Sequence, residues 1–239
     1  MIKLNTIEVS GWIPAITSMR NPKNSWDRSD SKIEDGIWSI GEKDMNLALN
    51  LAKGGPVHAK YRRMINVYAD ITAPLYWWKE FDTYKVGTVA NSCSTMHKIA
   101  DKEFTVDDFS HEHLFTRLDK DLCMWTIDVN GDACMYSSHG FLEMNVELLN
   151  KCRARYLETK DKRYWWQMIQ LLPSSYNQKR TVMLNYEVLH NIYFSRKNHK
   201  LDEWHTLCDW IETLPYSELI TTTEAGEVIK ERMNDNAQH

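Results

Sequence analysis

The chain has 239 residues, of which 43% are hydrophobic and 26% are charged, the balance of a soluble globular protein that can bury its own core. A formal net charge of −4 argues against nucleic acid as a partner. The apolar runs fall far short of the roughly 20 residues that span a bilayer, and the start of the chain lacks the apolar segment of a secretory signal, so we expect a cytoplasmic protein with no membrane partner.

Strand and helix patterns alternate in the first half of the chain. Alternating apolar residues predict a strand over residues 2–9, and a run rich in Asn, Ser and Asp predicts a loop over 18–36. Strong helix formers before a Gly-Gly stop predict a helix over 42–53. Residues 64–71 are rich in strand formers, and Pro74 marks the start of a further helix.

Helical patterns dominate the second half. A wide apolar face predicts mostly helical structure over 141–172, and β-branched residues predict a short strand over 180–186. Two helices are predicted over 187–196 and 201–214, before a polar tail over 222–239. Because strands cluster in the first half and helices in the second, we predict an α+β fold with an antiparallel or mixed sheet flanked by long helices.

Patterns that bind metals or supply nucleophiles are weak. None of the five cysteines forms a C-x-x-C pair, so neither a disulfide framework nor a zinc knuckle is expected. His111 and His113 have the spacing that places two imidazoles on one face of a strand, but the sequence offers no third ligand, so we predict no metal site. Cys93 has no base beside it in the sequence, which favours an inert cysteine over a nucleophile.

The run FDTYKVGTVANSCSTMHK, residues 81–98, follows an aromatic stretch and then loses hydrophobic periodicity. Small polar residues at this density indicate either a surface turn or a loop shaped around a polar ligand. The basic cluster KYRR at 60–63 fits a solvated strand entrance and phosphate contact equally well. Ten tryptophans and eleven tyrosines favour a large core and subunit interfaces.

Four features around this run occur in a defined order. His58 lies fifteen residues before Ala73, Ala73-Pro74 opens a predicted helix, and Asn91 and Ser94 follow in the polar run. This order resembles the flavin-dependent thymidylate synthases, whose signature is R-H-R-x-x-S-x-N-E-x-S-x-R. With the signature Asn placed on Asn91, its second Ser falls on Ser94. The departures from the signature are Tyr84, Lys85, Val86, Val89, Ser92 and Met96.

The C-terminal half carries the second part of the resemblance. Leu172-Pro173 is followed by Asn185, by Asn191 six residues later and by Arg196 five residues after that. The same family has a Leu-Pro, two asparagines six apart and an arginine five further on, in the same register. Two family arginines, one between the asparagines and one before the Leu-Pro, are Glu187 and Ile169 here.

The resemblance covers most of residues 55–215. It implies a thymidylate synthase-complementing-protein-like fold, with residues 1–221 as a single domain, in a homotetramer whose active sites lie at subunit interfaces. It also implies transfer of a methyl or hydroxymethyl group to C5 of a pyrimidine nucleotide such as dUMP. FAD would be the cofactor, and NADPH and methylenetetrahydrofolate would be co-substrates, so no protein thiol nucleophile is required.

The resemblance also implies roles for individual residues. The catalytic residues would be Ser94 and Arg196. The cofactor contacts would be His58, Lys60, Asn185, Asn191 and His199. The substrate contacts would be Tyr84, Lys85, Asn91, Ser92, Ser94 and Arg196. A nucleotide phosphate needs cationic partners, and the candidates that replace the missing family arginines are Lys85, Arg62, Arg63, Arg163 and Arg196.

Two alternatives stay open. The exchange of charged for small polar residues over 84–96 fits an altered substrate, and it also fits a divergent, non-catalytic member that binds a nucleotide or a protein partner. An unrelated α+β interaction protein would instead bind a partner through tryptophan-rich faces, with Trp77 and Trp78 as contact residues.

Overall fold

The structure, a computed structural model, describes residues 2–119, 121–128 and 130–223. The chain forms two compact units. Unit 1 comprises Met1–Lys3, Thr72–Asp82 and Ser92–Arg180, and unit 2 comprises Leu4–Ile71, Thr83–Asn91 and Thr181–His239. The single domain over 1–221 stays a prediction, and residues 224–239 of the predicted tail lie outside the described residues.

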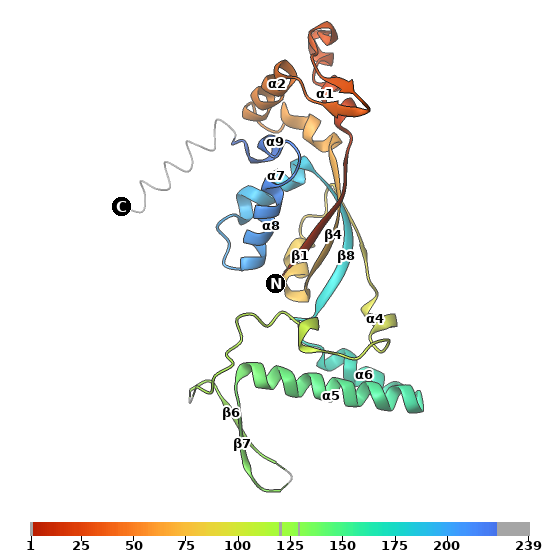
Figure 1. The fold of residues 1–239 in the computed structure, drawn as a ribbon, viewed down its shortest axis with the longest axis vertical. Coiled ribbons are helices and arrows are strands. Elements are labelled where there is room, and N and C mark those ends of the chain that lie inside the picture. Colours follow the sequence, from red (N-terminus) through yellow and green to blue (C-terminus); the bar gives the residue numbers. More distant parts are fainter. Residues whose placement is uncertain (1, 120, 129, 224–239) are drawn as a thin grey trace, which may run out of the picture. The chain divides into compact units, whose positions relative to one another are not determined.

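A four-stranded sheet has the strand order β1-β4-β8-β5 (Figure 1). Its strands are β1 (Lys3–Ser10), β4 (Asn66–Pro74), β8 (Asn177–Asn185) and β5 (Thr88–Ser92). Buried and half-buried residues alternate along most of β4, as the period of a strand requires, and the predicted strands at β1, β4 and β8 are confirmed. The prediction of a loop over 84–96 is wrong for β5, because β-branched Thr88 and Val89 favour extended backbone at this sheet edge.

Unit 2 contains most of the shorter helices. These are α1 (Trp12–Ser18), α2 (Glu42–Lys53), the 3-10 helix η3 (Ala59–Met64), α7 (Tyr186–Arg196), α8 (Asp202–Glu212) and α9 (Glu218–Thr221). Three of them, α2, α7 and α8, confirm predicted helices. Tyr186, Leu189 and Ile192 of α7 are fully or almost fully buried, as are Trp204 and Leu207 of α8. Burial of these side chains is the main contribution that holds α7 and α8 in place.

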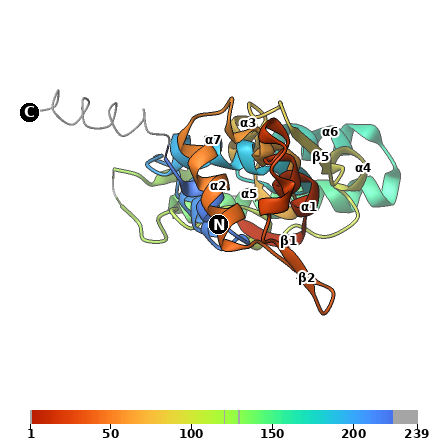
Figure 2. The same cartoon turned by 90° about the horizontal axis from the view of Figure 1, so that it is seen from above.

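Residues 18–36, predicted as a loop, contain regular structure. The 3-10 helices η1 (Asn21–Lys23) and η2 (Trp26–Arg28) precede a hairpin of β2 (Lys32–Glu34) and β3 (Ile37–Ser39), which projects beyond α1 in Figure 2. Asp35 and Gly36 have φ of 51° and 78°, the left-handed pair of a tight hairpin turn. An Asp-Gly dipeptide between short strands is the signal that could have predicted this hairpin.

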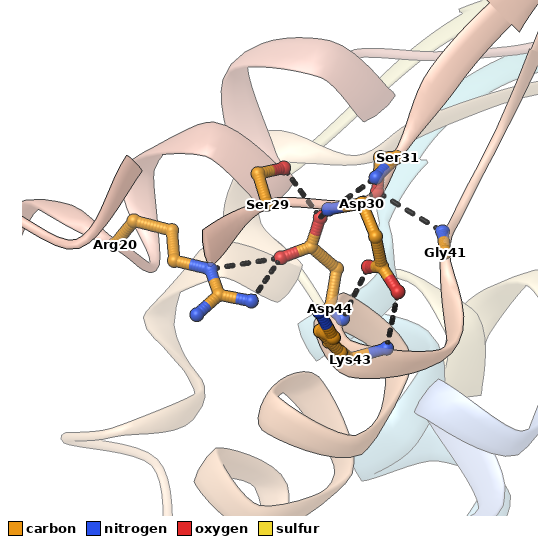
Figure 3. Close-up of polar contacts among 7 residues, drawn as sticks. All are labelled: Arg20, Ser29, Asp30, Ser31, Gly41, Lys43 and Asp44. Carbon is orange, nitrogen blue, oxygen red and sulfur yellow. Dashed lines mark hydrogen bonds and ion pairs between the residues drawn. The ribbon is translucent and has the colours of Figure 1, made fainter. Parts of the chain in front are cut away.

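A buried carboxylate holds this segment on α2. Asp44 accepts from Arg20 Nε and Nη2 at 2.8 and 2.6 Å, and from the hydroxyls of Ser29 and Ser31 at 2.6 and 2.7 Å (Figure 3). We call these four residues the Asp44 network. Burial acts to raise the pKa of Asp44, but the bonds from Ser29, Ser31 and Arg20 outweigh it and the pKa is lowered. The carboxylate is therefore held in its charged form.

Unit 1 is built around aromatic and aliphatic side chains. Its helices and strands are α3 (Leu75–Phe81), α4 (Thr95–Lys98), η4 (Val106–Asp108), β6 (Met124–Ile127), β7 (Ala133–Tyr136), α5 (Ser138–Thr159) and α6 (Lys162–Leu171). Pro74 precedes α3, which confirms the helix predicted there. Trp77 and Trp78 of α3 are 0% and 1% exposed, so the alternative in which they form a partner-binding face is wrong.

The helical region predicted over 141–172 is two helices. α5 ends at Thr159, and the next residue, Lys160, has a left-handed φ of 57°. Asp161 caps the start of α6 by accepting from Arg163 N at 2.9 Å. Leu149 of α5 and Met168 of α6 share one apolar core and are fully buried. Within the described ranges no helix is long and apolar enough to cross a membrane.

The two histidines considered as metal ligands do not lie on a strand. Glu112 and His113 are in a turn, and His111 Nδ1 lies 2.9 Å from the Phe109 carbonyl oxygen. The strand geometry that their spacing allows is therefore not formed. Among the described residues, no group of three or more His, Cys, Asp and Glu side chains is placed to hold a metal ion.

Candidate functional site

In unit 2, the segment 84–91 meets the end of α7. Arg196 Nε donates to Tyr84 Oη at 2.9 Å. The guanidinium carbon of Arg196 lies 4.5 Å from the ring centroid of Trp204 and 5.6 Å from that of Tyr84. A guanidinium on the face of a buried indole is held by cation–π attraction. The structure thus brings together Tyr84 and Arg196, two of the predicted substrate-binding residues.

Gly87 and Asn185 form a second contact between the same two segments. Gly87 has φ 78°, and a Cβ atom there would lie 2.9 Å from Asn185 Nδ2 and 3.2 Å from Val188 Cγ2. A side chain at position 87 therefore has neither the backbone conformation nor the space it needs. Asn185 Oδ1 accepts from Val188 N at 3.0 Å and caps α7. Asn185, predicted to contact the cofactor, thus has a structural task that the sequence reasoning missed.

The other predicted residues of unit 2 are placed differently. The His199 ring lies 6.1 Å from that of Trp204, beside Arg196. Asn191 is exposed on α7, and Lys85 and Asn91 are exposed in the 84–91 segment.

His58 and Lys60 line a separate cavity of unit 2, which we call the His58 cavity. Its volume is about 530 Å³, and its wall consists of Ser18, Met19, Asn21, Pro22, Leu51, Val57, His58, Lys60, Tyr61 and Met64. His58 and Lys60 are two of the predicted cofactor-binding residues. The other three, Asn185, Asn191 and His199, do not line this cavity. Six of the ten lining residues are apolar or aromatic, and His58 and Lys60 add an imidazole and an ammonium group.

Ser92 and Ser94 belong to unit 1. Ser92 ends β5 and is exposed, and Ser94 Oγ accepts from His97 N at 3.2 Å, which caps α4. Ser94 also lines a cavity of about 580 Å³, which we call the lysine cavity. Its wall consists of Lys3, Thr72, Cys93, Ser94, Thr95, Lys98, Asp101, Lys102, Asp107, Asp108, Tyr176, Asn177, Gln178 and Lys179.

Three of the basic residues proposed to replace the missing arginines have partners within the chain, and one of them, Arg62, is buried. Arg62 is 0% exposed, and its Nε donates to the Leu219 carbonyl at 2.6 Å, so the expectation that it contacts phosphate is wrong. Arg63 Nη2 lies 3.5 Å from Glu187 Oε1. Arg163 pairs with Asp161 at 2.6 Å at the start of α6. The lysines of the lysine cavity were missed, although Lys98 ends the polar run and Lys102 follows four residues later.

No protein-family model and no curated protein matches the chain. Among solved structures it is similar to thymidylate synthase X (ThyX) from Helicobacter pylori with FAD and dUMP, with a TM-score of 0.60 and 15% identity over 93% of this chain and 97% of that chain. It is also similar to the UMP/dUMP methylase PolB from Streptomyces cacaoi bound with 5-Br dUMP, with a TM-score of 0.59 and 13% identity over 94% and 96% of the two chains. The chain therefore has a ThyX-like α+β fold, as predicted.

Proposed function

We propose that the protein is a flavin-dependent enzyme that transfers a methyl or hydroxymethyl group to C5 of a pyrimidine nucleotide such as dUMP. The observation that carries this proposal is the meeting of segment 84–91 with α7, where Arg196 Nε lies 2.9 Å from Tyr84 Oη. The ThyX-like fold supports it, because similar structures hold FAD and dUMP. FAD is the proposed cofactor, NADPH and methylenetetrahydrofolate are the proposed co-substrates, and a cytoplasmic homotetramer is the proposed assembly.

The residues of the His58 cavity fit part of a flavin. A volume of about 530 Å³ is in the range of small-molecule sites, roughly 300–1,000 Å³. Leu51, Met19 and Met64 offer apolar surface to a flat ring, and His58 and Lys60 offer polar contacts. When bound, FAD would supply the redox chemistry. His58 and Lys60 would hold it here, and the exposed amide of Asn191 is a further proposed contact.

The roles proposed for Arg196 and its neighbours follow from their contacts. A guanidinium binds phosphate or carboxylate oxygens through paired N–H groups. Tyr84 accepts from its Nε and Trp204 supports its face, so the orientation of Arg196 is set before a ligand arrives. Asn185 acts indirectly, because it caps α7 and lies against Gly87, and so fixes the segment that carries Tyr84.

Two measurements on the purified protein test the proposal. Quenching of FAD fluorescence reports binding of the cofactor, and loss of NADPH absorbance reports turnover. We expect saturable FAD binding and NADPH oxidation that dUMP stimulates. Arg196→Ala should lower both nucleotide affinity and rate, whereas Arg155→Ala should leave them unchanged, because Arg155 pairs with Glu158 on the exposed side of α5. Protein that does not bind FAD would contradict the proposal.

A non-catalytic nucleotide-binding protein is the second candidate. It is favoured by Val86 and Met96, which are 91% and 49% exposed where the family signature has arginines. A surface valine and methionine cannot replace guanidinium contacts. This candidate predicts that dUMP raises the melting temperature while NADPH oxidation stays at the rate seen without nucleotide. Stimulated NADPH oxidation would exclude it.

A further inference from the structure

The lysine cavity lies wholly within unit 1. Segment 93–95 forms one wall, and residues 176–179 at the start of β8 form another. Gln178 joins these walls, because its Nε2 donates to the Cys93 carbonyl at 3.0 Å and to Thr95 Oγ1 at 3.2 Å. Arg180 in turn donates to Gln178 Oε1 at 3.0 Å. The hydroxyls of Ser94 and Thr95 are therefore held in fixed positions before any ligand binds.

The charge of this cavity favours an anion. Its lining has four lysines and three aspartates, a net charge of +1 in a chain whose net charge is −4. Lys98 pairs with Asp101 at 2.8 Å, with side chains 72% and 56% exposed, and Lys102 pairs with Asp108. Exposed pairs contribute little to stability. An arriving dianion can therefore draw the Lys98 ammonium away from Asp101 without a large loss. The Asp108 side chain is only 14% exposed, but it keeps the bond from Thr105 N at 2.9 Å when Lys102 turns to the anion.

Neutral hydrogen-bond donors complete the wall. Ser94 Oγ accepts from His97 N, and a hydroxyl that accepts one bond can still donate its own hydrogen. Burial raises the pKa of Tyr176, so its hydroxyl stays protonated and is also a donor. Hydroxyl donors together with ammonium groups are the chemistry that binds a phosphate monoester.

We propose that Lys98, Lys102 and Lys179, with the Ser94 hydroxyl, bind the phosphate of a phosphate monoester in the lysine cavity. The inference rests on the proposed function in taking that monoester to be the pyrimidine nucleotide. These three lysines would supply the positive charge that Val86 and Met96, which stand where the family signature has arginines, do not carry.

The test compares a double variant with a matched control. Lys98→Ala/Lys102→Ala removes two exposed lysines, and Lys151→Ala removes another in the same unit, 70% exposed and paired with Glu147 at 2.6 Å. Calorimetric titration with dUMP should show affinity lowered about ten- to hundredfold in the double variant and unchanged in the control. Lys98→Arg/Lys102→Arg should bind at the wild-type level. Deoxyuridine, which lacks the phosphate, should bind the wild type and the double variant equally.

The outcomes separate this inference from the proposed function. If the wild type binds dUMP and the double variant binds it as tightly as Lys151→Ala does, the lysine site is wrong and the proposed function stands. If the wild type binds inorganic phosphate but not dUMP, and the double variant loses that binding, the phosphate site stands and the nucleotide function falls. If the wild type binds neither, both are overturned. Equal melting temperatures of the double variant and the control show that a loss of binding is not a loss of folding.

Discussion

Two polar segments of the sequence have different roles in the structure. Residues 18–36 are rich in Ser, Asn and Asp, residues 81–98 are rich in Ser and Thr, and the polar composition of each predicts a loop or a turn. In the first, the hydroxyls of Ser29 and Ser31 and the guanidinium group of Arg20 all donate to the fully buried Asp44 (Figure 3). In the second, Ser94 lines an open cavity with exposed lysines. The difference shows that a polar segment can bind a ligand only where its polar groups are not already hydrogen-bonded to a buried side chain.

The largest effect should follow from breaking the Asp44 network. Asp44→Ala leaves the buried Arg20 without its carboxylate, and removal of one partner of a buried pair costs about 3–5 kcal/mol. Urea unfolding should show this loss, while Asp27→Ala, at an exposed position of η2, should change stability by less than about 0.5 kcal/mol. Equal stability of the two variants would mean that the network does not hold the segment.

The same network predicts a dependence on pH. Because the pKa of Asp44 is lower in the folded chain than in the unfolded one, its bonds stabilise the fold above about pH 4. That stability is lost as the pH falls through the lowered pKa. Urea midpoints measured between pH 7 and pH 3 should fall with pH in the wild type and fall less in Asp44→Asn. Parallel curves for the two proteins would refute the assignment.

Substitution of Gly36 and of Gly87 by alanine distinguishes the cost of a left-handed backbone from the cost of steric crowding. Both have φ of 78°, but only at Gly87 would a Cβ meet other atoms, the nearest being Asn185 Nδ2 at 2.9 Å. Gly36→Ala should cost about 1–2 kcal/mol for the left-handed backbone alone. Gly87→Ala should cost more and should also weaken dUMP binding, because segment 84–91 must move away from α7. Equal costs in urea unfolding would show that the two segments are not tightly packed.

The smallest effects distinguish Asn185, the N-cap of α7, from Asn191 within the helix. Asn185→Ala removes a helix cap and should cost about 1 kcal/mol. Asn191 is exposed, so Asn191→Ala should change stability by less than about 0.5 kcal/mol while it lowers FAD affinity about tenfold. Thermal melting and FAD fluorescence titration measure the two effects. An Asn191→Ala variant with wild-type FAD affinity would remove Asn191 from the proposed cofactor site.

The sequence was most informative where local signals decide structure. The Gly-Gly stop after α2, the proline before α3 and the Leu172-Pro173 break predicted real element ends. Asp35-Gly36 was also a local signal, and it was overlooked. The break between α5 and α6 was harder to predict, because Lys160 adopts a left-handed φ that glycine or asparagine more often takes.

Long-range pairings set the limit of the prediction. Arg20 and Asp44 are 24 residues apart, Tyr84 and Arg196 are 112 apart, and Gln178 and Cys93 are 85 apart. Nothing in the composition of either segment specifies these partners. The family resemblance gave Tyr84 and Arg196 a common substrate role, whereas the grouping of Lys98 and Lys102 with Lys179 is seen only in three dimensions.

The absorbance spectrum of the purified protein, recorded with added FAD and then during titration with dUMP, tests the central claim most directly. We predict a bound flavin band that survives gel filtration and changes on addition of dUMP but not of deoxyuridine at the same concentration. A colourless protein after gel filtration, or a flavin band that dUMP leaves unchanged at saturating concentration, would contradict the claim.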